Sequence, residues 1–208
     1  MHLIWLILLF QTIQEPSRNL SIPLPTKIFL PINMKTAFIN LQKKVKKKVD
    51  ILEALLYEDS IGVLGIGEID LPPLERPPFI NGYSCIIDSK TVTRVCTYIR
   101  QDFQYEQITY EGEIPCTIFN TPHTTFITAY SGFTSNPYSK DSARLSEKTR
   151  VNQILDLLNW VIQKARKNIL IIGDLNVDML TNSISKRRLL NWCNEYGLNQ
   201  LIESPTRV

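Results

Sequence analysis

The sequence predicts a mixed α/β or α+β domain with a substantial β-sheet, and three observations support this fold class. Residues 61–66 and 169–172 are short apolar, β-branched runs without polar alternation, which is typical of strands covered on both faces. The middle of the chain reads as a series of further short strands. Segments with apolar residues at helical spacing lie on either side of this middle region.

Length and composition describe an ordinary globular domain. The 208 residues are enough for a sizeable core, and the hydrophobic and charged fractions, 44% and 21%, are those of a soluble protein. The net charge of +3 is compatible with a polyanionic partner but too small to indicate one. Four cysteines without a Cys-x-x-Cys pair, together with two histidines, argue against a structural zinc site. Apolar neighbours of each cysteine predict buried free thiols, which favours an intracellular location, nuclear or cytoplasmic, over secretion.

The N-terminal 25 residues are expected to form an apolar leader and a proline-containing linker, followed by a domain over residues 26–208. Residues 3–10 are nearly all apolar but too few to span a bilayer, so we expect no membrane partner. A signal peptide and an irregular leader both remain possible readings of this stretch. No lysine or arginine precedes it and no small-residue cleavage site follows it, which disfavours the signal peptide.

The first elements of the domain are predicted as a strand and a helix. Residues 26–33 read as a strand, with Pro31 placing it at an edge or a bulge. Apolar positions at helical spacing predict a helix over residues 40–57. The lysines of this segment, among them Lys43, Lys44 and Lys47, fit either a solvated helix surface, which we favour, or a weak DNA-contacting stripe.

The later elements alternate between strands and helices. We expect strands at residues 61–66, 82–87, 94–100, 106–110, 116–120, 124–130 and 169–172. Ser146 is the expected N-cap of a helix that runs to residue 166. A last helix is expected over residues 185–196, with Gly197 just after its end.

Polar side chains follow several of these buried strands. Asp174 and Asn176 come after the strand at 169–172 and would point to the same side if the extended conformation continued. Glu68 ends another apolar run, and Tyr130 ends a third strand. An Asp can orient an attacking water, an Asn can donate to a phosphoryl oxygen, and carboxylates bind Mg²⁺. Each residue also has a plain interpretation, as a turn residue, a surface acid or an aromatic at a sheet margin.

The order of these motifs resembles that of the endonuclease/exonuclease/phosphatase superfamily, whose fold is DNase I-like. The resemblance rests on an ordered set of segments that covers the chain from about Thr26: Asn33, Gly67-Glu68, Asn81-Gly82-Tyr83, Arg94, Tyr130 and Gly173-Asp174-Leu175-Asn176-Val177-Asp178. The endonuclease domains of non-LTR retrotransposons are the most similar members, because residues 197–202 and 205–207 also match their pattern. The resemblance implies a two-sheet α/β sandwich flanked by helices.

The resemblance also implies roles for the individual residues. Glu68 would bind Mg²⁺ or Mn²⁺ with Asn33 beside it, and Asp174 would align or activate the attacking water. Asn176 would hold the scissile phosphate, and Tyr130 would support the transition state. The implied reaction is hydrolysis of a phosphodiester in DNA, and a reverse transcriptase of the same element is a possible partner.

Three departures from the family pattern affect this interpretation. The usual Glu-Thr-Trp-Leu is replaced by Glu68-Ile69-Asp70-Leu71, and Asn40 could take the place of Asn33 if a gap is shifted. The Ser-x-x-Asp-His element near the family's C-terminus has no counterpart here, so we expect a truncated domain lacking its last strands. Two alternatives therefore stay open. One is a non-catalytic remnant with at most weak nucleic-acid binding, and the other is a phosphatase or lipid phosphodiesterase of the same superfamily.

Overall fold

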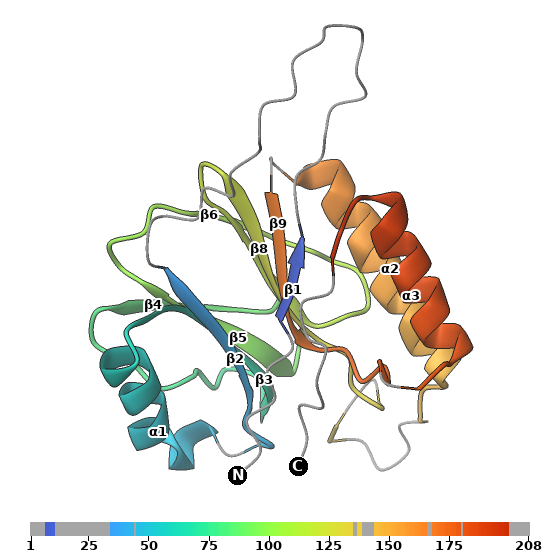
Figure 1. The fold of residues 1–208 in the computed structure, drawn as a ribbon. Helices are drawn as coiled ribbons and strands as arrows, with labels where there is room; N and C mark the ends of the chain where they lie inside the picture. Colours follow the sequence, from blue (N-terminus) through green and yellow to red (C-terminus); the bar gives the residue numbers. More distant parts are fainter. Residues whose placement is uncertain are drawn as a thin grey trace, which may run out of the picture.

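The computed structural model describes residues 7–10, 34–43, 45–134, 137–138, 144–165, 168–179 and 181–199. Its strands and helices follow one another along the chain as drawn in Figure 1. The strands are β1 (Ile7–Phe10), β2 (Lys35–Asn40), β3 (Ile61–Leu71), β4 (Tyr83–Ile87), β5 (Thr93–Arg100), β6 (Glu106–Ile108), β7 (Cys116–Asn120), β8 (Thr124–Tyr130) and β9 (Asn168–Asp174). The helices are α1 (Val49–Glu53), extended by a 3-10 turn before it (Val45–Lys47) and a π turn after it (Ala54–Glu58), α2 (Glu147–Lys164) and α3 (Ile184–Glu195).

Among the described residues the strands form two sheets. One has five strands in the order β1-β9-β8-β7-β6, and the other has four in the order β2-β3-β5-β4. Most neighbouring strands are antiparallel, but β2 and β3 are parallel, and β8 and β9 are parallel. These two parallel pairs direct the carboxyl ends of four strands, two from each sheet, to one edge of the molecule.

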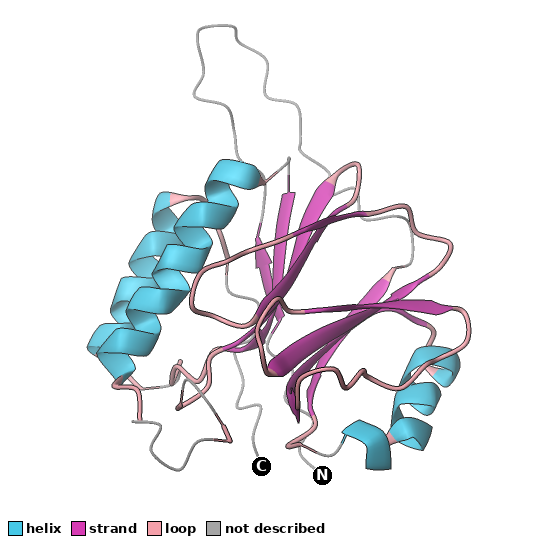
Figure 2. Cartoon of the chain, turned by 180° about the vertical axis from the view of Figure 1, so that it is seen from behind, coloured by secondary structure: helices cyan, strands magenta, loops and turns pink. Residues whose placement is uncertain are grey.

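The two sheets pack face to face, with helices on both outer faces (Figures 1 and 2). Helices α2 and α3 pack on the five-stranded sheet through a core that includes Leu158, Ile171 and Trp192. Helix α1 and its flanking turns cover the four-stranded sheet through residues such as Leu52, Leu56 and Tyr98. The result is a four-layer sandwich, as the resemblance implied.

Between the sheets lies a third apolar cluster and a small polar one. Phe38 from β2 packs here with Phe119 and Phe126, whose rings are stacked with centroids 4.8 Å apart. The hydroxyl of Thr97 in β5 donates to that of Thr128 in β8 at 2.7 Å and lies 2.5 Å from that of Thr117 in β7. Threonine hydroxyls thus bond across the intersheet space, which gives partners to three polar groups in an otherwise apolar layer.

Most predicted elements are confirmed. Strands β4, β5, β7, β8 and β9 lie at or within a residue or two of their predicted positions. Helix α2 begins after Ser146, whose hydroxyl accepts the Thr149 N–H, and α3 is followed by Gly197 with φ +67°. The Gly67-Glu68 segment is not a strand end, because β3 continues to Leu71 through an irregularity.

The prediction for residues 40–57 was partly wrong. Helical structure runs from Val45 to Glu58, so it starts later than predicted, and residue 40 instead ends strand β2 (Lys35–Asn40), which was not predicted. Ala37, Phe38 and Ile39 are buried in β2, but the lysine-rich stretch that follows obscured this short apolar run in the sequence. The strand predicted at 26–33 lies outside the described residues.

The N-terminal stretch contributes backbone to the five-stranded sheet. Strand β1, within the segment expected to be a leader, pairs antiparallel with β9. The domain boundary at residue 26 stays a prediction. In the parts of the chain that the structure describes, no helix has the length and apolar character needed to cross a membrane. Cys96, Cys116 and Cys193 are buried free thiols as predicted, whereas Cys85 is exposed.

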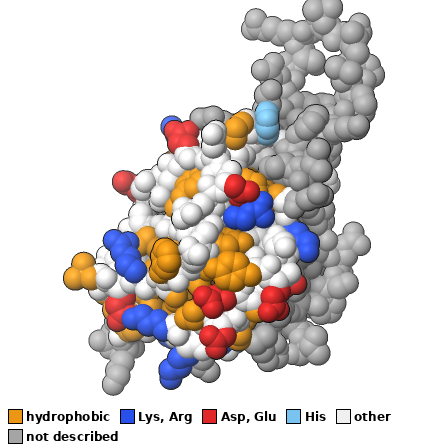
Figure 3. Space-filling view, turned by 90° about the vertical axis from the view of Figure 1, so that its left-hand side faces the viewer, with side chains coloured by type: hydrophobic (Ala, Val, Ile, Leu, Met, Phe, Trp, Pro, Cys, Tyr) orange, Lys and Arg blue, Asp and Glu red, His pale blue; other side chains and the backbone are white. Residues whose placement is uncertain are grey.

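The surface on the α1 side is mixed in character (Figure 3). Acidic and basic groups alternate there around exposed hydrophobic side chains, and the described part of this face carries no extended basic patch. Lys46 pairs with Glu75, and Lys43 with Asp70. This distribution favours the solvated-surface interpretation of the lysine-rich segment over a DNA-contacting stripe.

Candidate active site

A hydrogen bond between the two sheets marks the edge at which the parallel strands end. Asn40 is the last residue of β2 and lies beside Gly67 of β3, and Tyr130, the last of β8, lies beside Asp174 of β9. The Asn40 amide Nδ2 donates to Asp174 Oδ2 at 3.2 Å, and both side chains are buried. The structure therefore places Asn40, and not Asn33, next to Asp174. Asn33 lies outside the described residues.

Two glycines allow the strands to approach closely at this edge. A Cβ atom on Gly173 would lie 2.0 Å from the carbonyl oxygen of Ala129 in β8. A Cβ on Gly67 would lie 2.7 Å from the Phe38 ring. The glycines that precede Glu68 and Asp174 in the sequence are therefore required by packing.

Asp174 is held by two donors from different parts of the chain. Its Oδ1 accepts the backbone N–H of Asn176 at 3.1 Å, while its Oδ2 accepts from Asn40. The extended conformation expected after the strand does not persist, because Asn176 has φ +51°. The left-handed turn still keeps Asn176 at the site, and its amide donates to the carbonyl of Ser131 at 2.8 Å.

Glu68 lies within the irregular part of β3. It has φ +54° and is half-buried, and its carbonyl accepts the Lys43 N–H at 2.7 Å. A non-glycine residue in this region of φ is uncommon, and such residues gather at functional sites. Glu68 directly follows Gly67, the register partner of Asn40, so it lies beside the strand ends.

Tyr130 is buried at the centre of this group. Burial raises the pKa of its phenol well above the usual value, the charges of Glu68 and Asp174 raise it further, and the charge of Arg94 opposes the shift. The Arg94 guanidinium lies 4.8 Å from the ring centroid. Tyr130 is therefore protonated at neutral pH, which makes it a hydrogen-bond donor.

A buried ion pair supports Tyr130, and sequence reasoning did not identify its role. Arg94 Nε donates to Asp70 Oδ1 at 2.9 Å, and Arg94 Nη1 donates to the carbonyl of Thr134 at 2.8 Å. Lys43 Nζ lies 3.3 Å from Asp70 Oδ2. The departure Ile69-Asp70 from the family pattern thus has a structural counterpart, since Asp70 is the partner of the arginine under Tyr130. The sequence does not show that Asp70 and Arg94 are buried and paired with each other; this is seen only in the folded protein.

Arg150 at the start of α2 is a second residue that the sequence did not single out. Its Nη1 donates to the carbonyl of Asn176 at 2.7 Å, so the left-handed turn is fixed to a helix. The sequence offered one weak signal for Arg150, which is a charged residue beside apolar positions in the predicted helix.

Of the lysines proposed as weak nucleic-acid contacts, Lys43 lies next to the site, because its N–H donates to the Glu68 carbonyl and its Nζ pairs with Asp70. Lys47 is exposed at the end of the 3-10 turn. Lys44 lies outside the described residues.

The donors at the edge suit a hard cation. Mg²⁺ in proteins takes oxygen ligands, commonly one or two carboxylates completed by water and substrate phosphate. The Glu68 carboxylate and the amide oxygen of Asn40 are donors of this kind. Among the described residues, His, Cys, Asp and Glu side chains do not gather in groups of three that could hold a metal ion.

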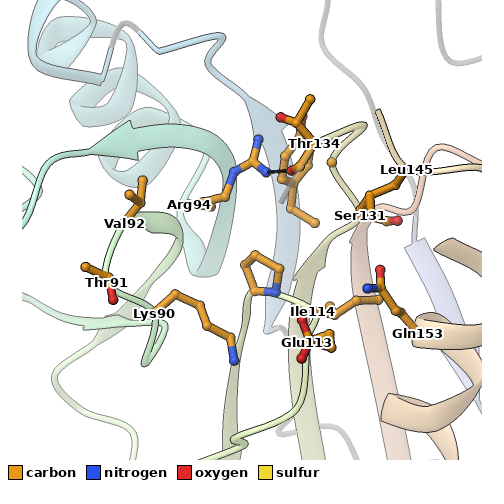
Figure 4. Close-up of a pocket in the computed structure, with 13 residues that line it drawn as sticks. Lys90, Thr91, Val92, Arg94, Glu113, Ile114, Ser131, Thr134, Leu145 and Gln153 are labelled. Atoms are coloured by element: carbon orange, nitrogen blue, oxygen red, sulfur yellow. Dashed lines mark hydrogen bonds between the residues drawn. The ribbon is translucent and has the colours of Figure 1, made fainter. Parts of the chain in front are cut away.

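A pocket of about 280 Å³ opens beside Tyr130. Figure 4 shows Arg94 and Thr134 at one end, Lys90 and Glu113 at the other, and Ser131, Leu145 and Gln153 along one side. Of the candidate site residues, Tyr130 lines this pocket, whereas Asn40, Glu68, Asp174 and Asn176 do not.

Comparison with solved structures shows the fold. The endonuclease domain of TRAS1, a telomere-specific non-LTR retrotransposon, superposes with a TM-score of 0.52 at 16% identity, over 82% of this chain and 76% of that domain. A humanized D. rerio TDP2 covers 75% of this chain and 66% of its own, with a TM-score of 0.48 and 14% identity. An endonuclease/exonuclease/phosphatase family protein from Leptotrichia buccalis covers 76% and 74%, with a TM-score of 0.43 and 15% identity.

The amino-acid sequence itself matches no family model and no curated protein. The three-dimensional arrangement of the two sheets and their flanking helices is what carries the relationship. The chain therefore has the DNase I-like fold of endonuclease/exonuclease/phosphatase proteins.

Proposed function

We propose that this chain is a divalent-metal-dependent phosphodiesterase that acts on DNA. The observation that carries the proposal is the Asn40–Asp174 hydrogen bond, which joins the two sheets at the edge where Glu68 and Tyr130 also lie. A base, a neutral donor, an amide and a metal-binding carboxylate at one edge are the groups that hydrolysis of a phosphodiester requires.

Asp174 is the proposed group that orients and deprotonates the attacking water. The Asn40 amide and the Asn176 backbone N–H fix the plane of its carboxylate. A fixed carboxylate loses little further freedom when it receives a proton, so orientation reduces the entropic part of the barrier.

Asn176 and Tyr130 are the proposed donors to the phosphoryl oxygens. The bond from the Asn176 amide to the Ser131 carbonyl fixes the orientation of this side chain. The raised pKa of Tyr130 keeps its proton in place while negative charge develops on the phosphate.

The cation is proposed to be Mg²⁺ or Mn²⁺, held by Glu68 and the amide oxygen of Asn40. When bound, such an ion stabilises charge on the phosphoryl oxygens and the leaving oxygen as a Lewis acid. Asn40 would then serve two purposes. Its nitrogen holds Asp174, and its oxygen, which accepts the Gln42 N–H at 3.0 Å, would use its second lone pair for the cation.

DNA is the proposed substrate, and an origin in a retrotransposon, with a reverse transcriptase as partner, is the proposed context. The likeness to the endonuclease domain named for a telomere-specific non-LTR retrotransposon supports both. Independently of that comparison, the ordered motifs from Gly67 to Asp178 support phosphodiester hydrolysis, and the segments at 197–202 and 205–207 support the retrotransposon context.

The deciding experiment is nicking of supercoiled plasmid by the purified chain. We expect nicking with Mg²⁺ or Mn²⁺, none with EDTA, and a loss of at least about a hundredfold in Asp174→Ala, as is usual when a catalytic base is removed. Asp102→Asn is the matched control, because Asp102 is exposed and pairs only with Arg100.

Three outcomes would contradict the proposal. Activity that survives in Asp174→Ala would come from a contaminant or another site. Turnover of a phosphoinositide or sphingomyelin without DNA cleavage would favour the lipid-phosphodiesterase alternative, and metal-independent DNA binding without cleavage would favour the non-catalytic one.

A further inference from the structure

Two arginines contact the same aromatic ring next to the candidate active site. The guanidinium carbon of Arg150 lies 4.6 Å from the centroid of Phe133, and that of Arg144 lies 5.2 Å from it. Phe133 is 39% exposed and Arg144 is exposed, whereas Arg150 is 6% exposed. We call these three residues the Arg-Phe-Arg cluster.

The backbone holds the cluster in a defined position. The Leu145 N–H donates to the Phe133 carbonyl at 2.7 Å, and Thr134 forms an antiparallel bridge with Arg144. Arg150 is in the first turn of α2 and bonds to the Asn176 carbonyl. The backbone of Phe133 and Arg144 is therefore held in place, and the Arg150 guanidinium is fixed to the turn that carries Asn176.

The cluster has more positive charge than its surroundings neutralise. Every ion pair among the described residues involves Lys43, Lys46, Arg94 or Arg100, so neither arginine of the cluster has a carboxylate at ion-pair distance. Within the described residues, the buried Nε of Arg150 also has no hydrogen-bond partner. A buried guanidinium N–H without an acceptor is costly, and an anion that binds beside it recovers part of that cost.

The pKa of Arg150 reflects the same local excess of positive charge. Burial lowers the pKa of Arg150, the charge of Arg144 lowers it further, and Glu147, Asp174 and Tyr130 oppose the shift. The bond from Arg150 to the Asn176 carbonyl places this guanidinium beside the turn that carries Asn176. An anion bound here would thus lie near the candidate site.

We propose that the Arg-Phe-Arg cluster binds a DNA phosphate adjacent to the scissile one. The inference rests on the proposed function and assigns to it a second phosphate subsite. Guanidinium groups bind phosphate through planar pairs of N–H donors, and the Phe133 ring holds both groups while excluding water from one face of each. Arg150 additionally positions Asn176 through its carbonyl, whereas Arg144 has no bond to the catalytic candidates and acts on the substrate alone.

The test measures binding without cleavage. A fluorescent 20-base-pair DNA duplex is titrated with the full chain in EDTA at several salt concentrations. We expect Arg144→Gln to weaken binding severalfold on all sequences and to lower the slope of log Kd against log salt by about 1, and Arg144→Lys to retain most of the slope. Arg100→Gln is the control, since it removes the same charge at the opposite end of β5 from Arg94 and near Asp102.

Three results would overturn the inference. These are an unchanged slope in Arg144→Gln, an equal loss in Arg100→Gln, and no binding by the wild-type chain at low salt. Circular dichroism of each variant verifies that the fold is retained. Plasmid nicking judges the proposed function separately, because an active chain with an unchanged slope keeps the proposed function and rejects only the subsite.

Discussion

Asp70 is a single residue on which several contacts of the candidate site depend. Its side chain is fully buried, and it pairs with Arg94 and Lys43. Arg94 in turn lies against the Tyr130 ring of the other sheet. A buried pair adds little net stability compared with apolar residues, but removing one partner leaves an uncompensated charge, which is strongly unfavourable.

We therefore expect Asp70→Asn to lower the free energy of unfolding by about 3 kcal/mol. The reason is that Arg94 stays buried with its charge no longer balanced. Urea denaturation followed by circular dichroism measures the change. Asp102→Asn, at the exposed pair with Arg100, should cost less than about 1 kcal/mol, and equal losses in the two variants would refute the distinction between the pairs.

At the scale of elements, the β4–β5 hairpin is organised by a buried carboxylate. Asp88 Oδ2 accepts the backbone N–H groups of Arg94 and Val95 at 2.7 Å each, and Oδ1 accepts that of Lys90 at 2.9 Å. These bonds define the start of β5 and so the position of Arg94. Burial raises the pKa of Asp88 to about 6, while the three backbone hydrogen bonds oppose the shift.

This raised pKa predicts a pH dependence of stability with a definite sign. Between about pH 4 and 6 the folded protein binds a proton at Asp88 that the unfolded chain has released, so the stability contributed by this group falls as the pH rises. The fall is on the order of 3 kcal/mol across the window. Asp88→Asn has no charge to titrate, so the unfolding free energy of wild type minus that of the variant should decrease from pH 4 to 7. A constant or increasing difference would show that the backbone hydrogen bonds outweigh burial.

How well each strand or helix could be predicted depended on how clear its local sequence pattern was. Strands β8 and β9 and helix α2 carry an apolar pattern and clear ends, such as the N-cap at Ser146, so local sequence was sufficient. Strand β2 has only three buried apolar residues in succession and is followed by lysines, so its pairing with β3, and not its own sequence, makes it a strand.

The whole molecule depends on how the two sheets are held together. The threonine hydroxyls of residues 97, 117 and 128 bond across the intersheet layer, and Asn40 and Asp174 bond across the same layer at its edge. Stability and the geometry of the candidate site thus share one interface.

We expect Thr97→Val to lower the free energy of unfolding by about 1 to 3 kcal/mol, because it leaves the hydroxyls of Thr117 and Thr128 unpaired in an apolar layer. Replacing all three threonines by valine should cost less than the sum of the single changes, since no unpaired hydroxyl then remains. Thermal and urea denaturation of the four variants test this, with the exposed Thr91→Val as control. Strict additivity would mean that the hydroxyls do not act as one network.

The sequence by itself determined the local part of this protein: the apolar strands, the capped helices, and Glu68, Tyr130, Asp174 and Asn176 as candidate site residues. Only the tertiary structure decided that Asn40 is the partner of Asp174, that Asp70 and Arg94 support Tyr130, and that Arg150 holds the turn at Asn176. The physical reason is one of range. A strand or a cap is set by neighbours within a few residues, whereas Asn40 and Asp174 are 134 positions apart and meet because two sheets pack face to face.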